Sequence, residues 1–188
     1  WVSMQDVSLM VEEKSALDFS EFNPTHTLID ADRLVINSRG RISKKQSTDK
    51  DAVFLMASLG FAPVNGGIPD HGTIDMYVSQ LRLRGYNMAR LDYIEDILMH
   101  KRSRDFDFDP KQMERFQYLL AALGKSGIYY VLTGVSGDNG GYGNIDNRWK
   151  NNKNLRMGLY YDPEKQTHWK VLIKKMFGGI NPYTGAAI

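Results

Sequence analysis

The sequence predicts an α/β fold in which buried strands alternate with amphipathic helices. Three short apolar runs have the length and composition of strands in a parallel sheet. Segments with apolar residues at helical spacing separate them, and glycines end the first two helices just before the next strand. Three such units match the first half of a (β/α)₈ barrel, which takes about 250 residues when complete. A small open doubly wound sheet is the alternative, and spacing alone leaves both open.

The first 50 residues form a separate amino-terminal region. Residues 1–27 have no clear pattern, which is typical of an extended leader or linker. Residues 33–42 predict a short β-hairpin whose tight turn uses Gly40. The pattern changes after the polar residues 44–51, so we divide the chain into an N-terminal extension with the hairpin (1–50) and a half-barrel (51–188).

The first strand–helix unit begins with residues 53–59, a near-continuous apolar run of the kind buried on both faces of a sheet. A loop rich in Gly and Pro, residues 60–69, leads to a helix that begins near Asp70 and ends at Gly85. The apolar stripe of this helix consists of Ile74, Tyr77, Val78 and Leu81.

The second unit begins with a predicted strand over residues 86–91. A charge-rich loop, residues 92–108, leads to Asp109-Pro110, a good helix start with Asp as N-cap and Pro at the first helical position. Gly127 follows this helix. Its buried stripe consists of Met113, Phe116, Leu120 and Leu123.

The third unit begins with a predicted strand over residues 128–132, followed by a glycine-rich loop that extends to about residue 160. Asp162-Pro163 repeats the helix start, and residues 181–185 form a turn after the helix. A fourth strand is expected where the chain ends. The stripe of the third helix consists of Trp169, Leu172, Ile173, Met176 and Phe177.

Composition excludes several classes of protein. The 188 residues include 24 Lys+Arg and 22 Asp+Glu, and the signs are interspersed, so we expect no nucleic-acid partner and no membrane partner. No apolar run approaches the ~20 residues of a membrane span. Because the chain has no Cys, disulfide scaffolds, thiolate metal sites and cysteine nucleophiles are excluded.

Short motifs for phosphate, nucleotide and metal chemistry are incomplete. Gly124-Lys125-Ser126 imitates the end of a phosphate-binding loop but lies between a helix and a strand, the reverse of the required order. Gly141-Tyr142-Gly143 lacks the third glycine of a dinucleotide motif, and Asp105 begins a calcium-like run that lacks the turn glycine. The four histidines are not at metal-ligand spacing. We therefore expect no metal and no other cofactor.

Polar side chains gather at the predicted carboxyl ends of the strands, where barrel enzymes place their chemistry. Such groups suit a polyhydroxylated ligand, because carboxylates and amides bind hydroxyls and aromatic rings stack on sugar faces. The alternative is that the acids only pair with Lys and Arg side chains in a solvated loop. Arg90 ends a strand expected to be buried, so it needs a carboxylate partner that its own segment does not obviously provide. The candidates are Ser58, Asn65, Arg90, Asp92, Tyr93, Glu95, Asp96, Thr133, Ser136, Asp138, Asn139 and Tyr142.

Residues 85–91, Gly-Tyr-Asn-Met-Ala-Arg-Leu, resemble the second-strand segment of cellulase-like glycoside hydrolases, family 5 and its relatives in the large (β/α)₈ clan. In that family a Gly-aromatic-Asn-x-x-Arg segment places an Arg beside the catalytic nucleophile. The resemblance covers about residues 50–188. Two positions depart from the family: Thr133 lies where many relatives have a His after strand three, and Asp92 lies where a His often follows the strand-two Arg. Further similar segments are 105–110, 119–130, 136–143, 161–163 and 181–185.

The resemblance implies a retaining glycoside hydrolase that acts on a poly- or oligosaccharide through two carboxyls ~5–5.5 Å apart. Both family glutamates would follow strands four and seven, beyond Ile188, so we expect the chain alone to be inactive. Arg90 would keep the nucleophile ionised. The expected substrate-binding residues are Asn87, Asp92, Tyr93, Glu95, Asp96, Asp138, Asn139, Tyr142 and Trp149, with the rings of Tyr142 and Trp149 stacking on sugar.

The implied protein is secreted or periplasmic and bacterial. Besides a saccharide, its expected partner is the C-terminal half of the same barrel or a second copy of the chain. The alternative function is a non-catalytic carbohydrate-binding or assembly module with the barrel fold. A small open α/β nucleotide-binding domain is a third, less favoured alternative.

Overall fold

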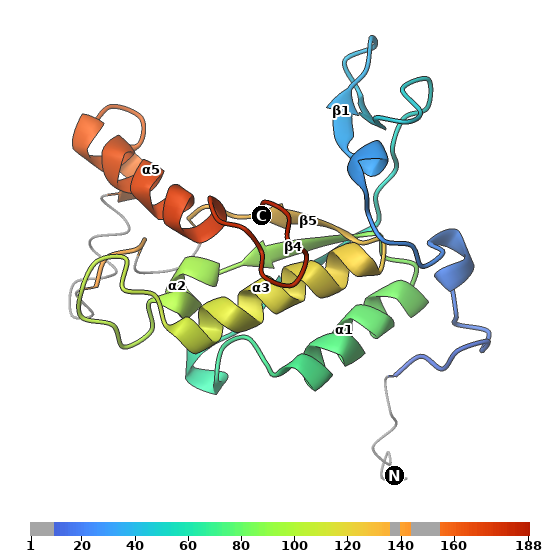
Figure 1. Cartoon of the computed structure of the whole chain (residues 1–188), viewed down its shortest axis with the longest axis horizontal. Helices are drawn as coiled ribbons and strands as arrows, with labels where there is room; N and C mark the ends of the chain where they lie inside the picture. The colour runs from blue at the N-terminus through green and yellow to red at the C-terminus, as the bar shows by residue number, and fades with distance from the viewer. Residues whose placement is uncertain (1–9, 136–139, 144–154) are drawn as a thin grey trace, which may run out of the picture.

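The centre of the molecule is a three-stranded parallel sheet (Figure 1). The computed structural model describes residues 10–135, 140–143 and 155–188. The sheet contains β3 (Met56–Gly60), β4 (Met88–Asp92) and β5 (Tyr129–Leu132), in that order. Ser58 pairs with Arg90, and Arg90 with Val131. The predicted α/β class with a parallel sheet is therefore confirmed.

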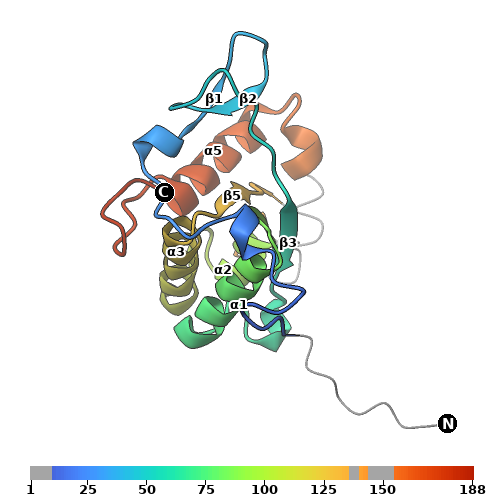
Figure 2. The same cartoon turned by 90° about the vertical axis from the view of Figure 1, so that its right-hand side faces the viewer.

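Two long helices, α1 (His71–Leu83) and α3 (Pro110–Lys125), lie side by side on one face of the sheet (Figures 1 and 2). Each begins at the predicted N-cap. The carboxylate of Asp70 accepts from the Thr73 N–H at 2.9 Å, and that of Asp109 from the Gln112 N–H at 3.0 Å. The third helix, α5 (Pro163–Phe177), starts at the predicted cap, Asp162.

A hydrophobic core fills the space between these helices and the sheet. Leu91 of β4, Ile74 of α1, Phe116 of α3 and Leu172 of α5 are all 0% exposed. Tyr77 departs from the predicted stripe of α1, because it is 39% exposed at the margin of the core. The helix faces predicted from spacing otherwise pack as expected, since apolar residues three and four apart share one side of a helix.

The strand order is compatible with both predicted sheet topologies. Successive described strands are neighbours, an order found in a barrel and also in the part of a doubly wound sheet that precedes its switch point. The three strands form an open sheet and do not close into a barrel. Among the described residues, no element covers the face opposite α1 and α3. This face carries Arg90 and Val131, and Val131 is 40% exposed.

The open face corrects the expectation that the first strand is buried on both sides. Met56 is 47% exposed because it lies on the face of β3 that no element in the described part of the chain covers, whereas Val53 (82% exposed) and Leu55 (53% exposed) precede the strand. The strand also begins later than predicted. Asn87 binds the preceding residues with its side chain, donating to the Val53 carbonyl at 2.9 Å and accepting from the Leu55 N–H at 2.8 Å.

The predicted charge-rich loop after β4 contains a short helix, α2 (Ile94–Leu98), that the sequence did not predict. Its N-cap, Tyr93, has a positive φ of 64° and no side-chain capping bond, so the usual start signal is missing. Ile94, Ile97 and Leu98 are buried against the core. Tertiary packing therefore forms this helix without local capping.

The amino-terminal region is docked rather than a free linker. The Phe19 N–H donates to the Leu83 carbonyl at 2.7 Å, and the Leu28 N–H donates to the Gly124 carbonyl at 2.9 Å. These carbonyls lie at the C-terminal ends of α1 and α3, where a helix leaves acceptors unsatisfied. The leader thus runs along the amino end of the sheet, away from the carboxyl ends of the strands.

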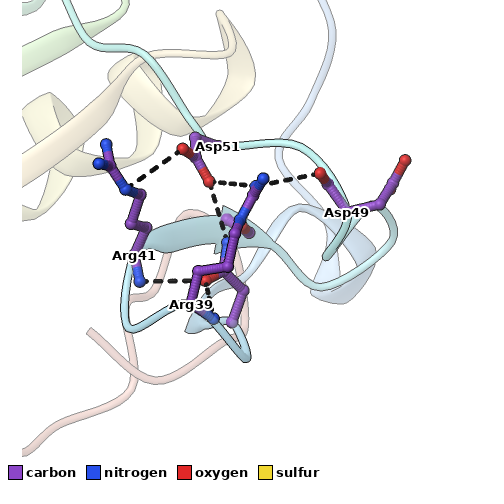
Figure 3. Close-up of polar contacts among 6 residues, drawn as sticks. Arg39, Arg41, Asp49 and Asp51 are labelled. Carbon is purple, nitrogen blue, oxygen red and sulfur yellow. Dashed lines mark hydrogen bonds and ion pairs between the residues drawn. The ribbon is translucent and has the colours of Figure 1, made fainter.

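The predicted hairpin is confirmed as β1 (Leu34–Ile36) paired with β2 (Ile42–Lys44), and Gly40 in its turn has φ 73°. A small polar cluster closes it (Figure 3). The Asp51 carboxylate pairs with Arg39 at 2.6 Å and Arg41 at 3.7 Å. The cluster is completed by Asn37, whose amide donates to the buried Ser43 hydroxyl at 2.7 Å and to Asp51 at 3.0 Å.

The chain ends in a turn and adds no fourth strand to the described sheet. Ile180 and Ala187 form an isolated bridge, and the Asn181 amide donates to the Gln117 carbonyl of α3 at 2.8 Å. Ile188 packs against the core cluster. Within the described residues, no helix is both long enough and apolar enough to span a bilayer.

Candidate functional site

Four polar side chains from three neighbouring strands meet at the carboxyl end of the open sheet face. Ser58 lies on β3, Arg90 and Asp92 on β4, and Thr133 directly after β5. Because successive strand residues point to opposite faces, Arg90 and Asp92 lie opposite the buried Ala89 and Leu91. The parallel register then brings residues from all three strands together. We call these four residues the strand-end cluster.

Asp92 is the centre of the strand-end cluster. Its Oδ1 accepts hydrogen bonds from Arg90 Nε at 3.1 Å and from the Thr133 hydroxyl at 2.7 Å. Its Oδ2 accepts from the Ser58 hydroxyl at 2.9 Å. The carboxylate partner that Arg90 requires therefore comes from its own segment, two residues along the strand, and the contrary expectation was wrong.

Arg90 also differs in its burial from the sequence-based expectation. The side chain of Arg90 is 47% exposed, whereas that of Asp92 is 13% exposed. The sequence predicted a buried cation, but the face that carries Arg90 has no covering element in the described part of the chain. The cost of burying the charge is correspondingly small.

The environment keeps Asp92 ionised at neutral pH. Burial raises the pKa of Asp92, but the hydroxyls of Thr133 and Ser58 and the charge of Arg90 lower it, and the net pKa lies below the usual 3.8. An ionised carboxylate that already accepts three hydrogen bonds is a poor proton donor and has little capacity for a further ligand. This geometry suits an anchor for Arg90 better than a direct contact with substrate.

Three other predicted site residues follow β4. Tyr93 is 48% exposed at the end of the strand, so its ring is accessible beside the strand-end cluster. Glu95 is 0% exposed in α2, and Asp96 is partly buried. The nearby basic residues pair elsewhere: Arg102 and Arg104 contact Asp107 at 3.1 and 3.8 Å.

The loop after β5 is described only in part. Asp138, Asn139 and Trp149, together with Ser136, lie outside the described residues. Tyr142 is described, and one face of its ring stacks on His168 of α5, with ring centroids 3.8 Å apart and planes 14° apart. Lys165 Nζ lies 3.4 Å from the Tyr142 hydroxyl. The stacking on His168 therefore occupies one face of the Tyr142 ring, which the sequence analysis expected to stack on a sugar.

His168 joins the loop to α5 and was not singled out from the sequence. Its Nε2 lies 2.9 Å from the Gly140 carbonyl oxygen, and its ring contacts Phe106 at 4.6 Å between centroids. Burial lowers the pKa of His168 despite the Gly140 contact. No local pattern signals this role, because the contacts join segments far apart in the chain.

Asn87 lies apart from the other predicted site residues. It precedes β4 at the amino end of the sheet, and its amide binds the backbone of residues 53 and 55. Asn65 lies in the loop after β3, at the end of a short 3-10 turn (Pro63–Asn65). The structure thus brings together Arg90, Asp92 and Tyr93, with Ser58 and Thr133 as supporting residues.

Comparison with protein-family models, with curated proteins and with solved structures gave no match for this chain.

The strand-end cluster offers a planar cation on an open surface. Arg90 is always charged, and its guanidinium can form paired hydrogen bonds with a carboxylate. Among the described residues, no group of three or more His, Asp or Glu side chains is arranged to hold a metal ion. The exposed guanidinium of Arg90 suits recognition of anionic or hydroxyl groups.

Proposed function

We propose that this chain is the amino-terminal part of a secreted or periplasmic glycoside hydrolase with a (β/α)₈ barrel. The observation that supports the proposal is the position of Arg90 in the strand-end cluster. It lies at the carboxyl end of a parallel sheet whose strands follow in chain order, with α1 and α3 on one face. That edge is where barrel enzymes bind substrate.

In the proposed enzyme, hydrolysis follows the retaining two-carboxylate mechanism, with both glutamates supplied by strands that continue the barrel past β5. Arg90 contacts the nucleophilic carboxylate and favours its ionised form. Tyr93 and Tyr142 line the saccharide site. The open face of the sheet becomes the interior of the barrel, which accounts for the exposure of Met56 and Val131.

The proposal is tested by comparing two polypeptides on aryl glycosides and on soluble polysaccharides. We expect the 188-residue chain to hydrolyse none of them, and a polypeptide that continues past Ile188 in the same reading frame to hydrolyse at least one with retention of anomeric configuration. Arg90→Ala in the longer polypeptide is expected to lower kcat by about 100-fold. Robust hydrolysis by a clean, monomeric 188-residue chain contradicts the proposal, as does inversion by the longer polypeptide.

A non-catalytic carbohydrate-binding or assembly module is the second candidate. This candidate needs no catalytic acid, whereas the enzyme needs two from strands past β5. Asp92 already accepts three hydrogen bonds and Glu95 is completely buried, so neither supplies one. Oligosaccharide binding by the longer polypeptide without any hydrolysis would favour this alternative over the enzyme.

A further inference from the structure

Residues 179–188 fold back onto α3 and the start of α1 (Figures 1 and 2). The Ile188 N–H donates to the Gly179 carbonyl at 3.2 Å and closes this segment at its base. The side-chain amide of Asn181, a residue that is 2% exposed, donates to the Gln117 carbonyl of α3 at 2.8 Å. We call residues 179–188 the C-terminal flap.

A single carboxylate oxygen joins the C-terminal flap to both helices. Glu114 Oε1, on α3, accepts a hydrogen bond from the Tyr183 hydroxyl of the flap. His71 Nε2, at the first position of α1, lies 2.7 Å from the same oxygen. The side chains of His71 and Glu114 are 43% and 42% exposed, so both can exchange protons with water.

The imidazole of His71 also stacks on an aromatic ring. It lies parallel to Tyr118 of α3, with ring centroids 3.7 Å apart and planes 4° apart. The Tyr118 hydroxyl donates to both carboxylate oxygens of Asp75, at 2.9 and 3.0 Å, which fixes the orientation of this ring. Tyr183 packs edge-on against Tyr118, with centroids 5.2 Å apart. We call five side chains the flap cluster: His71, Asp75, Glu114, Tyr118 and Tyr183.

Both acidic and basic groups surround His71. The positive end of the α1 dipole disfavours a charge on this residue, but the carboxylate of Asp70 caps the same end. The Tyr183 hydroxyl lowers the pKa of Glu114; burial raises it, and the hydrogen bond and charge of His71 and the charge of Arg115 lower it, with a net pKa below the usual 4.5. Glu114 is therefore an ionised acceptor at neutral pH. The titratable and charged groups around His71 are Asp70 and Asp75 of α1, Glu114, Arg115 and Tyr118 of α3, and Tyr183 of the flap.

We propose that the flap cluster is a pH-sensitive clasp, in which protonation of His71 tightens the hold of Glu114 on the C-terminal flap. A neutral imidazole gives Glu114 an ordinary hydrogen bond, whereas an imidazolium gives it a charge-assisted bond and also stacks as a cation on the Tyr118 ring. The firmer bond orders the Glu114 side chain in the position where the Tyr183 hydroxyl binds it. Histidine suits this role because its charge changes between about pH 5 and 8.

The clasp is separate from the candidate functional site. It lies on the helix side of the sheet, whereas the strand-end cluster lies on the opposite face (Figure 1). The inference therefore goes beyond the proposed function and does not rest on it.

Amide hydrogen exchange of the 188-residue chain, followed by NMR, tests the clasp. The reporting amides are those of Asn181 and Gly185, which donate to the Ala186 and Asn181 carbonyls at 2.8 Å each. Their exchange rates at about pH 7 and about pH 5 are divided by the intrinsic rates, which gives a protection factor at each pH.

His71→Gln supplies the reference, because its amide N–H can still donate to Glu114 but cannot gain a charge. We expect wild-type and His71→Gln protection to be equal at the higher pH, and wild-type protection to be about threefold greater at the lower pH. Effects of other titrating groups, such as His168, cancel in this ratio.

His26→Gln is the matched control. His26 also lies near a carboxylate, that of Asp32 at 3.6 Å, and its side chain is 42% exposed, close to the 43% of His71. It belongs to the amino-terminal region, where its Nδ1 lies 3.1 Å from the Pro24 carbonyl oxygen. Its substitution should leave the protection of the C-terminal flap unchanged at both pH values.

Two further variants separate the clasp from simple packing of α1 on α3. Glu114→Gln keeps an acceptor oxygen but has no charge, and Tyr183→Phe removes the hydroxyl that links the flap to Glu114. In either background, His71→Gln should no longer change the protection of the flap at the lower pH. A wild-type to His71→Gln ratio that is the same at both pH values, or that falls at the lower pH, overturns the proposal. A rise that persists in the Tyr183→Phe background also overturns it, because the effect then reaches the flap without the clasp.

Discussion

Replacement of Asp32 by Asn tests how the hairpin is fixed to the sheet. The side chain of Asp32 is 5% exposed, and its carboxylate accepts from the Ile29 N–H at 3.2 Å and from the Gln46 amide at 2.9 Å. Lys44 Nζ lies 3.5 Å away. The backbone carbonyl of Asp32 accepts from the Tyr129 hydroxyl at 2.7 Å, so the same residue joins the hairpin region to β5.

The magnitude follows from the contacts that asparagine cannot reproduce. The amide group of asparagine places an N–H where a carboxylate oxygen now faces a donor, so one hydrogen bond to a charged group is lost, at about 1.5–3 kcal/mol. The ion pair with the partly exposed Lys44 adds about 0–1 kcal/mol. We expect Asp32→Asn to lower the free energy of unfolding by about 1.5–4 kcal/mol in all, and Tm by about 2–4 °C for each kcal/mol in a chain of this size.

The assay is urea unfolding followed by circular dichroism, supported by calorimetry. Asp30→Asn is the matched control: Asp30 lies two residues away and pairs with Lys45, but its side chain is 69% exposed, so we expect no measurable change. Equal stability of the two variants would refute the argument from burial.

The effect of Asp32→Asn should depend on pH. Burial raises the pKa of Asp32, but the Ile29 N–H and the charges of Lys44 and His26 lower it, with a net pKa below 3.8. A lowered carboxyl pKa contributes stability that is present above the ordinary value and is lost as pH falls through the folded value. The difference between wild type and Asp32→Asn should therefore be full at pH 7 and shrink below about pH 4.

Further predictions concern stability elsewhere in the molecule. Because burial lowers the pKa of His168, the free energy of unfolding of the wild type should fall as pH drops below about 6.5. His168→Gln should remove this fall between about pH 7 and 5, and identical pH profiles for the variant and the wild type would contradict the prediction. Phe116→Ala should cost about 3–5 kcal/mol in urea unfolding, since the side chain is 0% exposed in the core. Gly127→Ala should lower the stability of the protein, because φ is +75° and the new Cβ would lie 2.9 Å from His26 Nδ1. Gly124→Ala should stabilise α3 by about 1 kcal/mol, because its new Cβ meets nothing within 4 Å. A higher Tm for Gly127→Ala than for Gly124→Ala refutes both predictions.

Local signals in the sequence predicted much of the fold. The caps Asp70, Asp109 and Asp162 start helices because their carboxylates reach N–H groups only two or three residues away, and this chemistry is visible in sequence. Gly40 marks the hairpin turn for the same local reason. The short helix α2 was missed because its N-cap, Tyr93, carries no capping side chain and its packing decides its conformation.

The site depended on information that the sequence does not hold. Period-two alternation indicates that Arg90 and Asp92 share a face, but which partner each takes depends on register and on whether that face is covered. The stacking of Tyr142 on His168 joins a loop to a helix in a later unit, and no spacing rule predicts it. The apolar run gave no sign that β3 begins only at Met56 or that Met56 would be exposed, because edge and central strands can share a composition.

Polar groups at the two ends of the parallel sheet serve stability and recognition separately. At the amino end, Tyr129 donates to the backbone of Asp32, and the leader satisfies the last carbonyls of α1 and α3, so polar groups there are used to hold the molecule together. At the carboxyl end, Asp92 takes three hydrogen bonds from its neighbours but leaves the terminal nitrogens of Arg90 exposed. Parallel strands make this division possible, because all their carboxyl ends lie at one edge of the sheet. Substitutions at Asp32 should therefore change Tm and leave the kcat of the longer polypeptide intact, whereas Arg90→Ala should lower kcat with a smaller effect on Tm.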